Sequence, residues 1–396
     1  MNILFIEDSD NLGGVQESTL LLAEGFIKQN YKVNVLIPNE GEMSKRLKKG
    51  LIPYWCYEPV RYLSTSISIN NDSSRIINPI AFIWNFFAII INSYKIKKNI
   101  KTKIEIVITK GLINHLCSGI AFNKYNRIKV IWHLQDLITK RYFNLGRIFF
   151  NSFAREVPDS IICDSLIIKD SLDKKSQKKT SVILNGIKTR SLISSKDYRK
   201  ESRKELNIPK NAYVLGHLAR ITPWKGQLYL VKAFIEYSRS NSNAYLLLVG
   251  SPLFTNGNYI NSIRTIINES NLKDKIILAG YNKDLKKMFS VMDLFLYPSL
   301  EKDTTPLALI SAMAAGLPVV MSKINSLIDI INHCPTIETF DPSSIKQLIA
   351  YMKKYENESL RYFHGKTNRK TAKKYFDIEL HTNSLTLILK QLLNTA

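Results

Sequence analysis

Short apolar runs alternate along the chain with longer segments that have the periodicity of helices. The first run, Asn2–Ile6, lacks polar alternation, as expected for a parallel strand covered on both faces. A glycine-containing turn and an amphipathic segment from Glu17 to Gln29 follow it. Because this strand–helix order recurs to about residue 338, the pattern predicts an α/β protein with parallel sheets.

The predicted strands fall into two series, separated by a polar, charge-rich stretch over 188–210. The first series comprises Asn2–Ile6, Lys32–Ile37, Ile52–Tyr57, Glu105–Thr109, Ile128–Trp132, Ser160–Cys163 and Ser181–Leu184. The second comprises Tyr213–His217, Ala244–Val249, Lys275–Ala279, Asp293–Tyr297, Pro318–Met321 and Thr336–Glu338. We therefore expect two Rossmann-like domains facing a cleft, 1–187 and 188–365, and a C-terminal helix over 366–396 that crosses back to the first domain.

Composition fits a globular protein of two or three domains, with 396 residues of which 45% are hydrophobic. Four scattered cysteines form no C-x-x-C pair, which excludes a zinc ribbon and argues against a disulfide scaffold. The amino terminus lacks the basic segment of a signal peptide. The longest apolar run, 76–91, contains Asn78, Pro79 and Asn85, so no membrane-spanning segment is expected. These features predict a reduced, cytoplasmic protein.

The formal charge of +23 is spread over both halves of the chain. Compositional bias and attraction to an anionic partner are both open explanations. The apolar run 76–91 is followed by five lysines before residue 104, and no acidic residue lies between Ser73 and Ile104. An interfacial helix on an anionic membrane and a buried helix with a solvated end both fit this pattern. Nucleic-acid binding is not expected, because no helix-turn-helix, zinc-finger or RNP-like signature is present.

The Gly13-Gly14 pair lies between the first strand and the first helix. Glycines there allow a ligand to approach the backbone and the free N–H groups of the helix. The G-x-G-x-x-G dinucleotide fingerprint is absent. A plain tight turn is an open alternative, and an acidic metal pocket of Glu7, Asp8 and Asp10, like that of a phospho-receiver domain, is a less favoured one.

Two cations follow the strand that ends near His217. Arg220 and Lys225 lie five residues apart, and Gly226 then opens an amphipathic helix. A pair of cations on a strand-to-helix loop suits a diphosphate, which both can neutralise. A solvated pair on a loop is the alternative.

The stretch from Tyr297 to Pro318 is more specific. It combines a strand, an acidic loop, a helix of small residues, a terminating Gly316 and a strand led by Pro318. The N-terminus of such a helix can direct N–H donors at an anion. Asp303 is expected beside it, where it can accept hydrogen bonds from sugar hydroxyls.

Taken together, these motifs resemble the retaining GT-B glycosyltransferases of the family 4 type, also described as group 1 glycosyl transferases. The matching pieces, in chain order, are Gly13-Gly14, Ile131-Trp-His-Leu-Gln-Asp136, Leu184-Asn-Gly-Ile187, Arg220 to Gly226, Leu248-Val-Gly250 and Pro298 to Pro318. The resemblance implies a metal-independent, retaining hexosyltransferase without a cofactor, whose co-substrate is a nucleotide diphosphate-sugar. It also implies roles for individual residues. The implied catalytic residues are Arg220, Lys225, His133 and Asp303, and the implied donor-binding residues are Gly13, Gly14, Gly250, Tyr281, Thr304, Thr305, Pro306, Leu307 and Ser311.

One position departs from the family's pattern. Its signature has two glutamates seven residues apart, where this chain has Asp303 and Ser311. Ser311 cannot supply the carboxylate that usually grips the ribose. We expect transfer to a lipid-linked saccharide acceptor in capsule, lipopolysaccharide or other surface polysaccharide synthesis, by a cytoplasmic enzyme that is peripheral on the inner membrane face. A nucleotide-sugar epimerase or hydrolase on the same scaffold and an inactive nucleotide-binding subunit are the alternatives.

Overall fold

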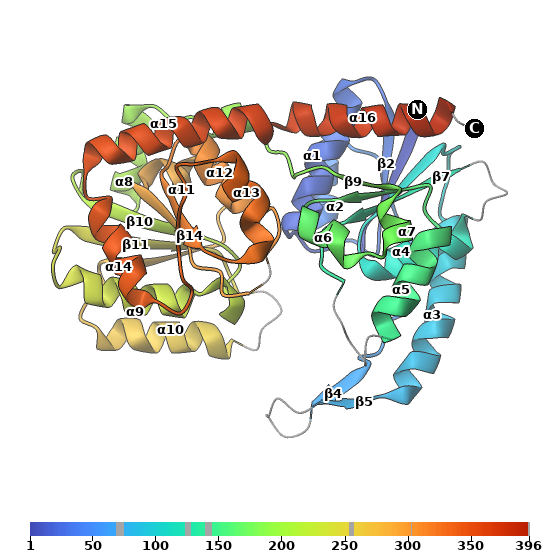
Figure 1. The fold of residues 1–396 in the computed structure, drawn as a ribbon, viewed down its shortest axis with the longest axis horizontal. Coiled ribbons are helices and arrows are strands. Elements are labelled where there is room, and N and C mark those ends of the chain that lie inside the picture. The colour runs from blue at the N-terminus through green and yellow to red at the C-terminus, as the bar shows by residue number, and fades with distance from the viewer. Residues whose placement is uncertain (69–74, 123–127, 139–144, 253–256, 302, 395–396) are drawn as a thin grey trace. The chain divides into compact units, whose positions relative to one another are not determined.

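The computed structural model describes residues 1–68, 75–122, 128–138, 145–252, 257–301 and 303–394. Its contacts divide the chain into two compact units. The N-terminal unit comprises Met1–Leu184 together with His381–Ala396, and the C-terminal unit comprises Asn185–Leu380. Each unit is built around its own parallel sheet (Figure 1).

The N-terminal unit contains a seven-stranded sheet in which every pairing is parallel. Its strands, in spatial order, are β3 (Tyr54–Cys56), β2 (Lys32–Ile37), β1 (Asn2–Ile6), β6 (Ile106–Thr109), β7 (Lys129–Leu134), β8 (Ser160–Cys163) and β9 (Thr180–Val182). Ile3 of β1 pairs with Val33 on one side and with Ile106 on the other. The strand order therefore reverses between β1 and β6, where such sheets leave a crevice for ligands.

Helices cover both faces of this sheet (Figure 1). They are α1 (Gly14–Lys28), α2 (Glu42–Lys49), α3 (Pro79–Lys98), α4 (Leu112–Ala121), α5 (Leu145–Glu156), α6 (Leu166–Ser171), α7 (Lys174–Gln177) and the greater part of α16 (Ile378–Asn394). Alternate side chains of β1 point to opposite faces. The Phe5 ring lies 6.2 Å from that of Phe26 in α1, whereas Leu4 joins the core that contains Cys117 of α4 and Phe150 of α5. This two-sided burial explains why β1 lacks polar alternation.

The C-terminal unit contains a six-stranded parallel sheet. Its strands, in spatial order, are β12 (Ile276–Gly280), β11 (Ala244–Val249), β10 (Tyr213–Leu218), β13 (Leu294–Tyr297), β14 (Val319–Ser322) and β15 (Glu338–Phe340). Its α-helices are α8 (Lys196–Glu205), α9 (Gln227–Ser238), α10 (Asn258–Glu269), α11 (Leu285–Val291), α12 (Leu307–Ala315), α13 (Ile328–His333), α14 (Ile345–Lys354) and α15 (Glu358–Tyr375). In this sheet the strand order reverses between β10 and β13, as it does between β1 and β6 in the first sheet. We call such a reversal a switch point.

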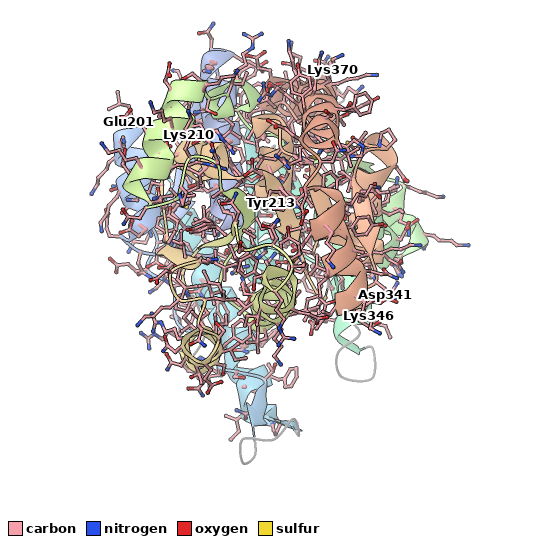
Figure 2. All side chains as sticks on the ribbon, turned by 90° about the vertical axis from the view of Figure 1, so that its left-hand side faces the viewer. Glu201, Lys210, Tyr213, Asp341, Lys346 and Lys370 are labelled. Atoms are coloured by element: carbon pink, nitrogen blue, oxygen red, sulfur yellow. The ribbon has the colours of Figure 1, made fainter. Side chains whose placement is uncertain are left out.

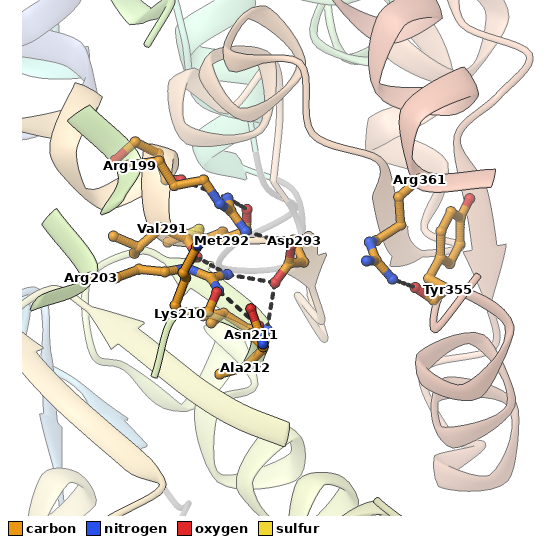
Figure 3. A network of polar contacts seen from close by, with 12 residues as sticks. Arg199, Arg203, Lys210, Asn211, Ala212, Val291, Met292, Asp293, Tyr355 and Arg361 are labelled. Carbon is orange, nitrogen blue, oxygen red and sulfur yellow. Dashed lines mark hydrogen bonds and ion pairs between the residues drawn. The ribbon is translucent and has the colours of Figure 1, made fainter. Parts of the chain in front are cut away.

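A buried arginine ties α8 to the start of β13 (Figure 3). The Arg203 guanidinium donates to the Asp293 carboxylate at 2.7 Å and to the carbonyl oxygens of Val291, Lys210 and Ala212. Arg199 of the same helix donates to the other Asp293 oxygen at 2.6 Å. Because Arg203 is only 3% exposed, these bonds compensate the removal of its charge from water.

The two-sheet α/β prediction is confirmed, and each strand predicted from the sequence has a counterpart in one of the two sheets. Four strands have the predicted bounds, namely Asn2–Ile6, Lys32–Ile37, Ser160–Cys163 and Ala244–Val249, and the other predicted strands differ by a few residues at their ends. An antiparallel hairpin, β4 (Ser66–Ser68) with β5 (Arg75–Ile77), was not predicted. All four cysteines are free.

Basic side chains of the C-terminal unit come from several elements (Figure 2). Lys210 precedes β10, Lys346 lies on α14 and Lys370 lies on α15, and all three are exposed. The positive charge of this unit is therefore dispersed. In the N-terminal unit, α3 is the one described helix whose length and hydropathy would suffice to cross a membrane, a test that core helices of soluble proteins can also pass.

Candidate functional site

The switch point of the C-terminal unit brings together the predicted residues of two separate motifs. Arg220 and Lys225 follow β10, and Asp303 follows β13, the neighbouring strand. In open parallel sheets, ligands bind beyond the carboxyl ends of the strands at this point. The sheet order therefore places the predicted cations and the predicted acid at the position where a ligand is expected.

The loops after β10 and β13 are fixed to each other. Gly226 has φ of +73°, and a Cβ there would lie 2.0 Å from the Pro298 carbonyl oxygen. The Trp224 carbonyl accepts hydrogen bonds from the Leu300 N–H at 2.8 Å and from the Ser299 hydroxyl at 3.2 Å. Only glycine allows this approach with a left-handed backbone. Lys225, between Trp224 and Gly226, is thereby held in one place.

Lys225 is paired within the site. Its ammonium donates to the Tyr297 hydroxyl at 2.8 Å and to the Asp303 carboxylate. The hydroxyls of Tyr297 and Ser299 also donate to that carboxylate. Burial and the charge of Asp303 raise the pKa of Tyr297, which keeps its hydroxyl protonated as a donor. The side chains of Lys225 and Asp303 remain 11% and 15% exposed, so both retain some surface.

Arg220 adds a second cation to this group. It is exposed, and its backbone carbonyl accepts a 2.7 Å hydrogen bond from the Gln227 side chain at the start of α9. Its positive charge opposes the rise in the pKa of Tyr297 that burial and Asp303 produce. Lys225 is paired with Asp303, and the charge of Arg220 reaches Tyr297, so the positive charge of Arg220 adds to a neutral pair and the group suits an anionic ligand.

The other predicted donor residues lie around the same strand ends. Gly250 follows β11 with φ of +143°, and a Cβ there would lie 1.9 Å from the Ala219 carbonyl oxygen. The Asn185 side chain donates to the Thr305 carbonyl at 3.2 Å, and Thr304 and Thr305 lead to Pro306, the N-cap of α12. Leu307 begins α12, whose first N–H groups are available to an acceptor. Tyr281, after β12, is 53% exposed, whereas Ser311 within α12 is 4% exposed.

In the N-terminal unit, buried polar groups gather at the carboxyl ends of adjacent strands. Glu7 follows β1, Lys110 follows β6, His133 lies near the end of β7 and Asp164 follows β8. All four are at most 1% exposed. His133 Nε2 lies 2.8 Å from Asp164 Oδ1, and the Gln135 amide donates to the other Asp164 oxygen at 2.7 Å.

Glu7 and Lys110 are the most strongly perturbed charges of this cluster. Burial raises the pKa of Glu7 to about 7, although Lys110 opposes the shift. Burial also lowers the pKa of Lys110, although the negative charges of Glu7, Asp164 and Asp8 oppose this shift. The Lys110 ammonium donates to the Ser18 hydroxyl at 3.1 Å, and the Glu7 carboxyl accepts from the side chains of Gln16 and Thr19. The protein satisfies these groups internally.

The His133 side chain is enclosed in this cluster. Its exposed fraction is 0%, and its ring lies 6.2 Å from that of His381 on α16. Burial and the Lys110 charge lower its pKa. Within the described residues, Nδ1 has no hydrogen-bond partner. The predicted contact with a transferred sugar stays a prediction, and it requires either a rearrangement around the ring or contact through the backbone.

Gly14 is the first residue of the 15-residue helix α1, and Gly13 is its N-cap. A Cβ at Gly14 would meet nothing within 4 Å. Gly13 has an extended backbone with φ of −136°, so its conformation does not require glycine. Packing of the chain therefore does not explain the glycine at position 14, and the predicted role of Gly14 in donor binding stays a prediction.

Sequence reasoning missed Lys110 and Asp164. Each directly follows a short apolar strand, as Glu7 does, and that placement is the signal that could have found them. Charged residues in these positions meet at one edge of a parallel sheet although they lie far apart along the chain.

The acidic-pocket alternative gains no support. The Gln16 amide donates to Glu7 at 3.1 Å and to Asp8 at 3.4 Å. The Asp8 carboxylate lies where a Cβ of Gly111 would be. Across the described ranges, no group of three or more His, Cys, Asp or Glu side chains is placed to hold a metal ion.

Fold and motif order together define a GT-B glycosyltransferase. Residues 12–191 match the family model "Glycosyltransferase Family 4", and residues 198–374 match "Glycosyl transferases group 1". The chain belongs to the group 1 glycosyltransferases of GT-B fold.

Among curated relatives, the chain is 23% identical over 336 residues to the Escherichia coli UDP-Gal:alpha-D-GlcNAc-diphosphoundecaprenol alpha-1,3-galactosyltransferase, covering 83% of this chain and 80% of that enzyme. It is 28% identical over 186 residues to the Salmonella typhimurium lipopolysaccharide 1,2-N-acetylglucosaminetransferase, covering 44% of this chain and 47% of that enzyme. The structure resembles that of Anabaena HepE in complex with UDP and glucose, with a TM-score of 0.80 and 18% sequence identity. The similarity covers 98% of this chain and 99% of HepE. Homologues that synthesise O-antigen and lipopolysaccharide support a glycosyltransferase role.

Proposed function

We propose that this protein transfers a hexosyl group, with retention and without a metal ion, from a UDP-sugar to a lipid-linked saccharide during surface polysaccharide synthesis. The observation that carries the proposal is the pair Arg220 and Lys225 at the β10–β13 switch point, beside Asp303 and the N-terminus of α12. Bond cleavage adds one negative charge to the departing nucleoside diphosphate, and cations placed there stabilise the transition state.

Each group of the site has a task in this proposal. Arg220 and Lys225 neutralise the departing diphosphate, and the free N–H groups of α12 direct partial positive charge at it. Asp303 accepts hydrogen bonds from sugar hydroxyls while it orients Lys225. Gly14 leaves room for the donor beside its backbone, because a Cβ there would meet nothing within 4 Å. Tyr281 flanks the base. Ser311 replaces the usual carboxylate near the ribose with a buried hydroxyl.

Retention needs no covalent intermediate here. As the bond between the anomeric carbon and the diphosphate oxygen breaks, the acceptor hydroxyl attacks the same face of the sugar. The departing phosphate oxygen takes the acceptor's proton, so the products are the glycoside and a nucleoside diphosphate. The cations and the helix N-terminus supply the charge stabilisation that a divalent metal would otherwise give.

The choice of substrates is supported by the relatives. The name of the E. coli relative specifies UDP-Gal as donor and a saccharide on diphosphoundecaprenol as acceptor. HepE was solved with UDP and with UDP-glucose. A lipid-linked acceptor would place this protein at the inner face of the cell membrane, as a cytoplasmic enzyme attached peripherally.

A donor panel tests the proposal. We expect a UDP-sugar to raise the melting temperature more than GDP- or ADP-sugars, and EDTA to leave transfer to a diphosphoundecaprenol-linked saccharide unchanged. NMR of the product is expected to show the anomeric configuration of the donor. Release of free sugar or an epimer without acceptor would instead favour the hydrolase or epimerase alternative. Absence of any nucleotide-induced shift would favour an inactive subunit, to which the Ser311 substitution points.

A further inference from the structure

Helix α3 has its polar and apolar sides reversed relative to an ordinary surface helix. Asn85 and Asn92, together with Ala81 and Ala88, lie on the side that faces the protein, and of these only Asn85 is not fully buried. Helices on a globular protein normally turn their large apolar side chains inward and their polar side chains to water. The arrangement of α3 therefore indicates that its outer side meets an apolar medium.

The inward amides fix the orientation of the helix. Asn92 accepts from the Val60 N–H at 2.7 Å and donates to the Val60 carbonyl at 3.0 Å. Asn85 pairs in the same way with Leu63, at 2.8 and 2.9 Å. Both amides thus pair with the backbone N–H and carbonyl groups of the 60–63 segment. Rotation of α3 that buried its apolar side would break all four bonds.

The outer side of α3 is a continuous apolar stripe. Ile80, Ile83, Phe87, Ile90 and Tyr94 recur at intervals of three or four residues and are 72%, 64%, 54%, 40% and 66% exposed. At these intervals residues lie on one face of a helix. Contiguous apolar surface of this kind marks a site that meets another apolar surface.

The charges beyond the stripe indicate an anionic lipid surface. Lys97 and Lys98 are exposed at the end of α3, and Lys101 and Lys103 follow it, also exposed. No acidic residue lies between Ser73 and Ile104. If two copies of the chain packed together along this stripe, the lysines of one α3 would meet no acidic residue on the α3 of the other. Anionic headgroups supply the opposite charge, and acyl chains accept the apolar side chains.

We propose that the outer face of α3 inserts into the interfacial region of an anionic bilayer, with the lysines at the headgroups. The helix lies in the surface rather than across it, because its inner side is bound to the 60–63 segment and packs against α4. The surface holds the N-terminal unit at the membrane, where a lipid-linked saccharide would be available. The inference does not depend on the proposed reaction, since lipid binding can be measured without donor or acceptor.

The full chain is tested with vesicles of phosphatidylglycerol and phosphatidylethanolamine, and with phosphatidylcholine vesicles for comparison. We expect co-sedimentation with the anionic vesicles, at least tenfold weaker for Ile83→Glu/Phe87→Glu. Lys97→Gln/Lys98→Gln is expected to bind about 30-fold more weakly, since each of the two lysines near such a surface contributes about 1 kcal/mol. The matched control Leu166→Glu/Leu387→Glu alters side chains that are 47% and 63% exposed on α6 and α16, and should bind as the wild type.

Trp84 gives a second measurement that does not rely on disruptive variants. Its ring is 42% exposed on α3, so brominated lipid should quench its fluorescence, and Trp84→Phe should lose most of that quenching. Failure of the wild type to bind, or equal binding by the Ile83→Glu/Phe87→Glu variant, would overturn the proposal. A dimer in solution that this variant dissociates, without vesicle binding, would assign the surface to a second copy. Unchanged UDP binding by the variant would show that the donor site is intact.

Discussion

The Lys225 ammonium donates a 2.8 Å hydrogen bond to the Tyr297 hydroxyl, and both groups donate to the carboxylate of Asp303. These residues come from the loop after β10, from β13 and from the loop after β13. The same cation that is predicted to neutralise a diphosphate is thus aligned by the acid predicted to bind the sugar.

Replacement of Lys225 by methionine keeps much of the side chain's volume and removes its charge. We expect the rate of sugar transfer to fall by about 10²–10³-fold, as for loss of one oxyanion donor. Asp303 retains its hydrogen bonds from Tyr297 and Ser299, so the fold should persist. Steady-state kinetics with a saturating donor measure the effect. Lys210→Met, at an exposed position outside the site, is the control, and near-wild-type transfer by Lys225→Met would refute the assignment.

Gly14→Ala separates a ligand role from a structural one. A Cβ at this position meets nothing in the protein, and alanine is the better helix former by up to about 1 kcal/mol. We therefore expect an unchanged or raised melting temperature together with a higher KM for the donor. In contrast, Gly25→Ala would place Cβ 2.4 Å from the Thr382 hydroxyl and should destabilise the protein by about 1–3 kcal/mol. Unaltered donor kinetics in Gly14→Ala would argue for a plain turn.

Arg203→Met is expected to destabilise the C-terminal unit strongly. It removes the guanidinium that bonds Asp293 and several carbonyl oxygens (Figure 3). Loss of one partner of a buried pair costs about 3–5 kcal/mol. Urea denaturation, followed by circular dichroism, measures the resulting decrease in the free energy of unfolding. The exposed Arg239, changed to methionine, should stay within about 0.5 kcal/mol of the wild type.

Buried His217 makes stability depend on pH. Burial lowers its pKa to about 4 from an ordinary value of 6.5, and Nδ1 is hydrogen-bonded to the Leu296 carbonyl at 2.8 Å. Between these two pKa values the unfolded chain binds a proton that the folded chain does not, so stability falls as the pH drops from about 6.5 to about 4. One such proton contributes about 1.4 kcal/mol per pH unit.

Thermal unfolding at several pH values, compared between the wild type and His217→Gln, checks this dependence. Between about pH 6.5 and pH 4 the variant should lose stability less steeply than the wild type. The slope of its unfolding free energy against pH should be smaller by up to the contribution of one bound proton. Identical slopes would mean that His217 does not remain neutral in the fold.

Local patterns of the sequence were sufficient to predict the strands of the two parallel sheets and several glycines, although not the β4–β5 hairpin. Ala244–Val249 is apolar on both faces and was predicted with its observed bounds. Gly226 and Gly316, predicted to open and to terminate helices, have φ of +73° and +84°. Such features depend on neighbours within a few residues, and the physics that selects them acts over the same short range.

The buried cluster of the N-terminal unit could not be predicted in the same way. Lys110 and Asp164 lie 103 and 157 positions from Glu7 along the chain, and the strand order of the sheet brings them to one edge. His133 was predicted to contact a sugar, and its enclosure beside Asp164 became visible only in the fold. Side-chain burial depends on all the elements packed around a position.

By itself, the sequence determined that two series of doubly covered strands form parallel sheets, because an apolar run without alternation is stable only between two layers of helices. It also determined which residue types stand at the strand ends. Tertiary structure alone decided that Lys225 meets Asp303, and that α3 turns Asn92 inward and its aromatic rings outward. Those outcomes depend on strand order and on competition for backbone partners between segments remote in the chain, which no local pattern encodes.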